Sequence, residues 1–341
     1  MRILLWLAGV AGVAVIGWCG WWFVAATGQE QALDLWLEER REDGWLAEVS
    51  AVSIGGFPSR FERRLEAPQL ADPAAGWAWQ APFLALGSDA WDPTHVTIDF
   101  PAVQSVAVPA GRARVESTGM QALAAVVPGL SLALREVALR AEALSIEGRD
   151  GWRAGSGLLD LSLARRTDTD APENTYDLRM NAEALLLPER LAGVLTPEGA
   201  EAGRDATGDG TLEVRGIIIA DRPIDLAVID RGEIGAETIV LRQTRLSYGG
   251  AVFEVDGRLD ADAEGFAEGT LNVAAQDWRR VLKALVASGT IGEGMASTIR
   301  NALQFVSLFA GEKLEVPLSF DDGRIGIGPV AIGDAPRLVA R

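Results

Sequence analysis

The sequence predicts a mainly β protein with few helices, an α+β chain built on a large, curved, mostly antiparallel sheet. Short runs that alternate apolar and polar residues recur from Trp45 to the C-terminus, most of them bounded by Gly, Asp or Pro. Few segments beyond residue 44 have the apolar spacing of a helix. One long apolar segment comes before all of them, at the N-terminus. We therefore expect a transmembrane helix first, then a groove or open barrel of strands, with C-terminal helices covering part of it.

The N-terminal apolar segment covers residues 3–26. No charged residue lies between Arg2 and Glu30. At about 1.5 Å per residue, such a helix is about 36 Å long and can cross a hydrocarbon core of about 30 Å. Trp18, Trp21 and Trp22 stand near its end, where amphipathic rings prefer the membrane interface. The sequence therefore predicts a transmembrane anchor over residues 1–28, with these three tryptophans at the interface.

Charges on the two sides of the anchor predict its orientation. Arg2 precedes it, whereas the first arginine after it is Arg40, beyond several carboxylates. Basic residues close to a membrane helix stay in the cytoplasm, so the N-terminus is expected inside and the bulk of the chain outside. A cleaved signal peptide stays open as an alternative, because Val24-Ala25-Ala26 resembles a cleavage site.

A short amphipathic helix is predicted next, over residues 29–44. Leu33, Trp36 and Leu37 recur at helical spacing between charged residues, and Gly44 ends the pattern. We expect this helix to lie along the membrane surface or to cap the following domain, which covers residues 45–341.

That domain is expected to be rich in β-strands. Leu46–Gly55 alternates and leads into the turn at Gly56-Phe57-Pro58-Ser59-Arg60. Gly249-Gly250 predicts a tight hairpin. Further strands are predicted at Trp77–Leu86, His95–Phe100, Ser105–Val108, Ala113–Ser117, Leu130–Leu134, Val137–Ile146, Gly157–Ala164, Tyr176–Leu186, Thr211–Ile219, Ile224–Ile229, Thr238–Tyr248, Ala251–Asp260, Glu268–Ala274, Lys313–Phe320, Gly323–Ile327 and Pro329–Ile332.

Helices are predicted at Pro188–Val194, Asp277–Ala287 and Gly294–Ala310. The last two can cover only part of so many strands. The rest of the sheet must close on itself or leave an apolar surface open, and both outcomes remain possible from the sequence. A Gly- and Asp-rich segment at 199–210 is the expected division if the domain has two halves.

Composition excludes several classes of function. The 341 residues carry a formal net charge of −17, which disfavours binding to nucleic acid. The single cysteine, Cys19, lies in the anchor, and the single histidine, His95, lies in a predicted strand. Asp260 to Gly265 resembles the start of a calcium loop, but Leu271 stands where a bidentate Glu is needed. We expect no catalytic residues, no cofactor and no metal site, and therefore no enzyme.

A set of short motifs in a fixed order carries a resemblance to a known family. The turn residues Gly56, Phe57, Pro58 and Arg60 belong to it. The other motifs are Trp77 and Trp79 with Ala81-Pro82, Asp92-Pro93-Thr94-His95, Leu246 to Gly249, Asp256 to Leu259, Gly269 to Leu271, and Gly328-Pro329. In this order they resemble an uncharacterised family of inner-membrane-anchored envelope proteins of Gram-negative bacteria, catalogued as a domain of unknown function.

The C-terminal half is also distantly similar to AsmA-like envelope proteins. That resemblance implies a role in envelope lipid homeostasis, with acyl chains as ligands in an apolar groove, and it implies no catalytic residues. We therefore expect a single-pass protein of the bacterial inner membrane, held by residues 3–26 with its bulk in the periplasm. The alternative expectation is a scaffolding protein of the envelope that has a closed β core and binds a protein partner.

Overall fold

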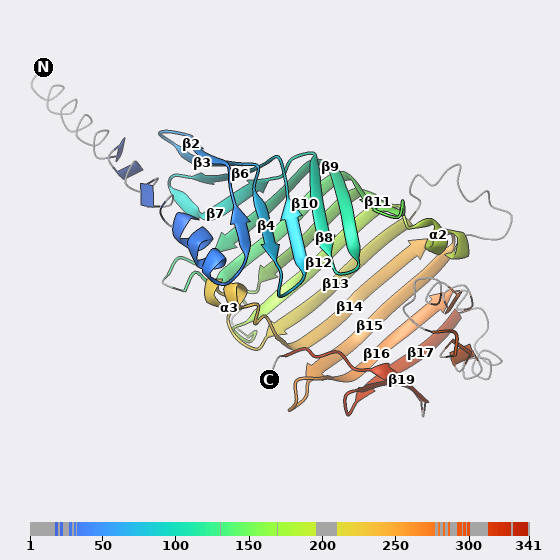
Figure 1. Ribbon diagram of the computed structural model, residues 1–341. Coiled ribbons are helices and arrows are strands. Elements are labelled where there is room, and N and C mark those ends of the chain that lie inside the picture. Colours follow the sequence, from blue (N-terminus) through green and yellow to red (C-terminus); the bar gives the residue numbers. More distant parts are fainter. Residues whose placement is uncertain are drawn as a thin grey trace, which may run out of the picture. The chain divides into compact units, whose positions relative to one another are not determined.

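The structure is a computed structural model that describes residues 18–19, 21–22, 27–28, 31, 33–129, 131–168, 170–195, 210–276, 279, 282–283, 286, 292–294, 296–297, 299–300, 313–328 and 330–339. The chain divides into two compact units, Met1–Val115 and Glu116–Arg341 (Figure 1). The predicted anchor falls mostly outside the described residues. Among the residues that are described, no helix has the length and apolar character needed to cross a membrane.

Most of the described chain is β, as predicted. The first unit holds a helix over 33–42 and the strands β1 (Leu46–Glu48), β2 (Ala51–Gly55), β3 (Arg60–Glu66), β4 (Gln69–Asp72), β5 (Trp77–Gln80), β6 (Phe83–Asp89), β7 (Asp92–Asp99) and β8 (Val103–Val108), and β9 (Gly111–Val126) begins in it. The second unit holds the rest of β9 and β10 (Leu134–Gly148), β11 (Arg153–Arg165), β12 (Thr175–Leu185), α2 (Glu189–Leu195), β13 (Gly210–Ala220), α3 (Leu226–Arg231), β14 (Ala236–Tyr248), β15 (Ala251–Ala261), β16 (Ala267–Gln276), β17 (Lys313–Asp321), β18 (Arg324–Ile327) and β19 (Val330–Asp334).

Strands of the first unit pair in two short series. In one series β3 lies between β2 and β6, and β6 also pairs with β7. In the other, β4 lies between β1 and β5, and β5 also pairs with β8. The helix over 33–42 confirms the predicted amphipathic helix. Its Leu37 is 5% exposed, and Gly44 follows it with a positive φ of 85°.

The second unit is one antiparallel meander. Each strand from β10 to β19 pairs with the next strand along the chain, and Figure 1 shows β12 to β17 as consecutive strands. In the pairings of the described strands, β19 contacts β18 alone, so the sheet is open and does not close into a barrel. The fold alternative of a barrel is therefore wrong, and the scaffolding alternative stays a prediction.

The predicted division near 199–210 lies almost wholly outside the described residues. The strands that flank it, β12 and β13, pair antiparallel from Thr175–Ile219 to Leu185–Gly210. The compact units instead divide within β9, at Val115. The expected domain bounds stay a prediction.

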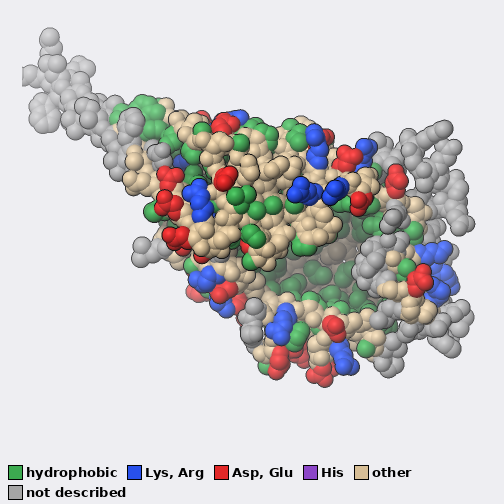
Figure 2. All heavy atoms as spheres, viewed as in Figure 1, with side chains coloured by type: hydrophobic (Ala, Val, Ile, Leu, Met, Phe, Trp, Pro, Cys, Tyr) green, Lys and Arg blue, Asp and Glu red, His purple; other side chains and the backbone are tan. Residues whose placement is uncertain are grey.

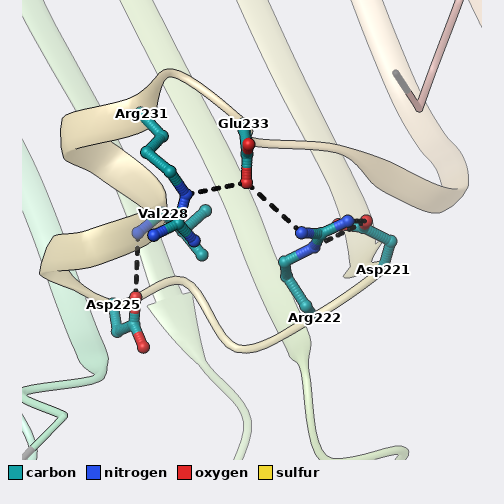
Figure 3. A network of polar contacts seen from close by, with 6 residues as sticks. All are labelled: Asp221, Arg222, Asp225, Val228, Arg231 and Glu233. Atoms are coloured by element: carbon teal, nitrogen blue, oxygen red, sulfur yellow. Dashed lines mark hydrogen bonds and ion pairs between the residues drawn. The ribbon is translucent and has the colours of Figure 1, made fainter. Parts of the chain in front are cut away.

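One predicted strand, Ile224–Ile229, is wrong, because this segment forms α3. The Asp225 side chain accepts a hydrogen bond from the backbone N–H of Val228 at 2.9 Å and caps the helix (Figure 3). Gly232 ends the helix in the left-handed conformation. The alternating apolar residues concealed these caps. Glu233 forms ion pairs with Arg222, which precedes α3, at 3.4 Å and with Arg231, at the end of α3, at 2.9 Å (Figure 3). These contacts hold the two ends of the helical segment together.

Two other predictions need correction. Trp77–Leu86 is not one strand but two, β5 and β6, because Pro82 has no N–H for a ladder and the N–H of Ala81 donates to the carbonyl of Pro68 instead. Leu130–Leu134 is not a strand in its described part, since β10 starts only at Leu134. The hairpin at Gly249-Gly250 is confirmed. The segment that resembled the start of a calcium loop is a turn, in which the Asp262 carboxylate accepts from the Phe266 N–H at 2.7 Å.

Candidate functional sites: an apolar sheet face and an aromatic cluster

The second unit has one apolar face and one polar face. Along β15, residues Phe253, Val255 and Leu259 alternate with Glu254, Asp256 and Arg258. Residues that pair across an antiparallel ladder point to the same face, and Val255 pairs with Val273, whereas Asp256 pairs with Asn272. The pairing register therefore collects the apolar residues of both strands on one side, which we call the apolar face.

The apolar face continues across the sheet from β10 to β17. Following the register from strand to strand gives apolar residues at almost every position. Thr244 in the middle and Arg165 at one end are the polar exceptions among these paired positions. The members are Val137, Leu139, Ala141, Leu159, Leu161, Leu163, Tyr176, Leu178, Met180, Ala182, Leu212, Val214, Gly216, Ile218, Ile239, Leu241, Leu246, Tyr248, Phe253, Val255, Gly257, Leu259, Ala261, Ala267, Gly269, Leu271, Val273, Ala275, Val316, Leu318 and Phe320.

The opposite face carries ion pairs between neighbouring strands and along strands. Arg245 lies 2.8 Å from Glu254, and Arg215 lies 2.6 Å from Glu213. Arg258 donates to Asp260 at 2.7 Å, and this hydrogen bond holds the pKa of the Asp260 carboxyl below its ordinary value of 3.8. A depression of about 570 Å³ on this face is lined by Arg140, Arg179 and Arg215 together with Asp160 and Glu213. Since the face is charged and exposed to water, it is a solvated surface.

Both ends of the apolar face are covered. At one end, Leu282, Ala296 and Ile299 from the segment 279–300 form a buried cluster with Ala275, in the region where the C-terminal helices were predicted. Leu195 of α2 packs nearby on Tyr248. At the other end, Leu134 and Ile224 bury Tyr176, and Ala335 packs with Leu259 and Phe320. Desolvation there raises the pKa of the Tyr176 phenol, whose hydroxyl donates to the Leu134 carbonyl at 3.3 Å.

Between these ends lies a central band that is not covered in this way. We define it by one or two residues from each strand between β10 and β16, namely Leu139, Leu161, Met180, Val214, Leu241, Leu246, Val255 and Val273. All of them are partly exposed. No buried cluster among the described residues of the second unit includes any of them. Figure 2 shows hydrophobic side chains gathered over β13 to β15 in this region.

The second candidate site lies in the first unit, where two predicted sets of residues meet. The Trp18 indole N–H donates to the Pro58 carbonyl, and the Trp22 indole N–H donates to the Arg60 carbonyl, both at 2.9 Å. The Trp22 ring stacks on Phe61 at 5.5 Å between centroids and meets the edge of Phe57 at 5.2 Å. The tryptophans predicted for the membrane interface thus contact the turn that carried the family resemblance.

The turn conformation depends on Gly56. Its φ is 88°, and an added Cβ would lie 2.6 Å from the Arg60 carbonyl oxygen. The backbone N–H of Arg60 donates to the Gly56 carbonyl at 2.8 Å and closes the turn. The Phe57–Pro58 peptide bond is cis. A side chain at position 56 would displace the carbonyl that receives the Trp22 indole.

Burial divides the aromatic residues of this cluster into two groups. Trp22 is 4% exposed and Phe61 is 3% exposed, and both pack on Ala90 in the turn between β6 and β7. Trp18 and Trp21 are 39% and 44% exposed, and Phe57 is 49% exposed. Trp22 therefore lies against protein, while its neighbours remain open to the surroundings.

Sequence reasoning missed three members of the cluster. Phe61, Ala90 and Trp91 were not singled out. Trp91 follows the buried Ala90 and is 66% exposed. Trp91 could have been found because it is a large aromatic residue between two predicted strands, where turns usually carry polar residues. Arg60 lies 3.7 Å from Glu62 and 3.9 Å from Asp89, so its charge is balanced within the cluster.

Neither site has the geometry of a catalytic or metal centre. In the described part of the chain, no group of three His, Cys, Asp or Glu residues could hold a metal ion. His95 lies in β7, as predicted for a strand residue, and its Nδ1 is 2.6 Å from Asp92. The two candidate sites consist of apolar surface, in the central band and in the aromatic cluster.

Fold and sites together define a mainly β protein with a large open antiparallel sheet, apolar on one face and charged on the other. The chain belongs to the family described as "Uncharacterized protein conserved in bacteria (DUF2125)", whose sequence profile matches residues 22–336. No curated protein matches the chain. No solved structure matches it.

Proposed function

We propose that this protein is a membrane-anchored envelope protein that binds lipid acyl chains on the apolar face of its sheet, without catalysis. The observation that carries the proposal is the central band, which crosses the sheet without a charged residue and stays partly exposed between two covered ends. Large apolar surfaces of soluble domains usually mark a binding site.

The size of the band fits an acyl chain. Strands in a sheet are about 4.8 Å apart, so the six steps from β10 to β16 span about 29 Å. One leaflet of a hydrocarbon core is about 15 Å deep, half of a core of about 30 Å. An extended chain laid across the strands would thus contact apolar side chains along its whole length.

The chemistry of the band selects an apolar ligand over a peptide or a sugar. None of its eight members has a polar side chain. Thr244 pairs with Val214 and Val255 of the band, and its Oγ1 is buried without a hydrogen-bond partner. A polar ligand would lose its hydrogen bonds to water and find no replacement, at a cost of about 1–3 kcal/mol for each buried group. A methylene chain has no such groups to lose, and it gains about 0.8 kcal/mol for each buried CH₂.

The proposed location follows from the N-terminal segment. Residues 3–26 are apolar and uncharged, and we propose that they hold the protein in the bacterial inner membrane, with the bulk in the periplasm. The resemblance to AsmA-like proteins, which implies a role in envelope lipid homeostasis, supports the same proposal. In this location the apolar face would lie next to the source of its lipids. A net charge of −17 argues against attachment to anionic head groups by charge alone.

The test uses a photoactivatable fatty acid and the full chain in phospholipid nanodiscs. After illumination, mass spectrometry maps the crosslinked peptides. We expect them to come from β10 to β16. The variant Leu161→Gln should weaken crosslinking about tenfold, because it removes one apolar contact of about 1.5–3 kcal/mol from the band.

Leu158→Gln is the matched control. Leu158 lies on the same strand, is also partly exposed, and pairs with Glu183 on the polar face. It should leave crosslinking unchanged. Crosslinks spread evenly over both faces, or an equal loss in both variants, would contradict acyl-chain binding. A protein recovered from the envelope at one copy per chain, with no lipid on the face, would favour the scaffolding alternative.

A further inference from the structure

We infer that the exposed aromatic residues of the first unit form a second membrane contact, beside the anchor, that enters the interfacial layer of the bilayer. The four residues are Trp18, Trp21, Phe57 and Trp91. The inference rests on the proposed anchoring by residues 3–26 and goes beyond it, because it assigns a membrane-contacting surface to the folded domain.

The first argument is placement. Trp18 and Trp21 are helical residues in the last third of the apolar segment 3–26, with ring centroids 5.0 Å apart. Phe57 is joined to them through Trp22, which it meets at 5.2 Å. Trp91 follows Ala90, whose backbone N–H donates to the Ser59 carbonyl at 2.9 Å and which packs on Trp22. Trp21 and Phe57 therefore lie close to Trp18 and Trp22 of the proposed anchor, and Trp91 is the next residue after the Ala90 that packs on Trp22.

Exposure gives the second argument. These side chains are 39%, 44%, 49% and 66% exposed in the order Trp18, Trp21, Phe57, Trp91. Large aromatic side chains are rarely left so open together on a soluble domain, and Trp is the residue that most favours the membrane interface. The bilayer is the occupant that the position of the cluster favours, since Trp18, Trp21 and Trp22 of the cluster belong to the apolar segment 3–26.

The third argument is rigidity. The indole N–H groups of Trp18 and Trp22 donate to carbonyls of the Gly56–Arg60 turn, at 2.9 Å each. The Trp22 ring is held between Phe57 and Phe61. The turn therefore holds Trp18 and Trp22 of the proposed anchor against the domain, so that Phe57 and Trp91 stay at a constant depth in the bilayer.

The experiment measures depth in the bilayer with the full chain. Cys19 is the only cysteine, so Cys19→Ser gives a background for single labels. Phe57→Cys, Trp91→Cys and Val108→Cys are each made in it and labelled with an environment-sensitive fluorophore. The proteins are reconstituted in phosphatidylcholine vesicles with or without lipids brominated on the acyl chain near the head group. Val108 is the control, because it is 47% exposed but lies at the end of β8, which pairs with β5 and not with β3 or β6.

We expect emission at positions 57 and 91 to shift to the blue, and quenching by brominated lipid to be at least about twofold stronger than at position 108. Quenching at 57 and 91 no stronger than at 108, in protein that floats with the vesicles, would overturn the inference and leave the anchor intact. Protein that does not float with the vesicles would overturn the proposed anchor and this inference with it. Labels that quench at 57 but not at 91 would also overturn the four-residue surface.

Discussion

At the scale of single residues, short polar contacts decide local structure that apolar patterns leave open. The segment around Ile224 alternates like a strand, yet Asp225 and Gly232 cap it as α3. Ile224 and Val228 are buried, at 5% and 4% exposed, and a short helix buries these side chains as well as a strand would. The side-chain hydrogen bond of Asp225 then favours the helix over the strand.

Removal of this cap should destabilise the second unit. We expect Asp225→Ala to lower the free energy of unfolding by about 1 kcal/mol, since the Val228 N–H loses its acceptor. Asp225→Asn keeps an acceptor oxygen and should cost much less. Urea unfolding of the full chain in detergent measures both. Equal losses in the two variants would show that the carboxylate charge, and not the cap, is what matters.

The Asp260 carboxylate should make stability depend on pH. Its pKa is lowered first by the hydrogen bond from Arg258 and further by that from Thr238, which donates at 2.7 Å. A carboxyl whose folded pKa lies below its unfolded value of 3.8 stabilises the fold above that value. This contribution is lost as the pH falls through the lower folded pKa.

The pair is largely exposed, with side-chain exposures of 59% and 46% in Arg258 and Asp260, so the effect should be small. We expect Asp260→Asn to be less stable than the natural chain at about pH 6, and the difference to shrink below about pH 3.8. Urea unfolding at about pH 6 and below about pH 3.8 measures this difference in stability. Asp256→Asn, on the same face, is the control. A difference that grows on acidification would contradict the assignment.

At the scale of elements, the sheet is defined by close approach of neighbouring strands. Gly257 in β15 pairs with Leu271 in β16, with a φ of 143°. A Cβ there would lie 2.2 Å from the Thr270 carbonyl oxygen. The two strands can therefore keep their ladder across the apolar face only with glycine at this position.

Gly257→Ala should separate β15 from β16 locally. We expect it to cost more than about 1 kcal/mol of unfolding free energy, because both φ and the space are incompatible with a side chain. Gly333→Ala in β19 is the control, since a Cβ at that position meets nothing within 4 Å and its φ is not in the positive range. Hydrogen exchange should show the loss at β15 and β16. Equal stability of the two variants would mean that the strands adjust at no cost.

At the scale of the whole molecule, an uncharged apolar segment and a strongly acidic domain lie in different parts of the chain. The N-terminal segment is uncharged, whereas the full chain carries a net charge of −17. If the proposed anchor holds the protein, attachment depends on apolar transfer and not on charge. Screening by salt should then leave it unchanged.

We expect the full chain to stay with membranes in about 1 M salt, where the Debye length is only about 3 Å. Val13→Arg places a charge in the middle of the apolar segment, at a cost of about 2.5–3.5 kcal/mol, and should release part of the protein. Sedimentation of membranes at low and high salt measures both. Release of the natural chain by salt alone would argue for a peripheral attachment.

Much of the fold could be predicted because a half-buried strand has a period of two. Val252 to Asp260 and Glu268 to Ala274 alternate so strictly that strand and face follow from the residues alone. Turn chemistry at Gly249-Gly250 and after Asp260 is equally local. The prediction failed where a short apolar run suited two structures, as at Ile224, and where Pro82 interrupted a run of strand-forming residues.

The candidate sites were predictable only in part. Trp18, Trp22 and Phe57 were singled out, but for separate reasons, and no spacing rule links residue 22 to residue 61. Their meeting depends on contacts between segments about 40 positions apart. Ala90, which precedes Trp91, reaches Trp22 next to the pairing of β6 with β3, which is equally non-local.

By itself, then, the sequence determined that the chain is mainly β, that its strands have one apolar and one polar side, and that an uncharged segment precedes them. These properties depend on neighbouring residues, whose chemistry acts over a few positions. Only the tertiary structure decided that the sheet stays open, that described segments cover its ends while the central band stays partly exposed, and that Trp22 packs on the Gly56–Arg60 turn. Those outcomes depend on which distant segments meet, and the apolar side of a strand is the same whether a helix, a second sheet or a ligand covers it.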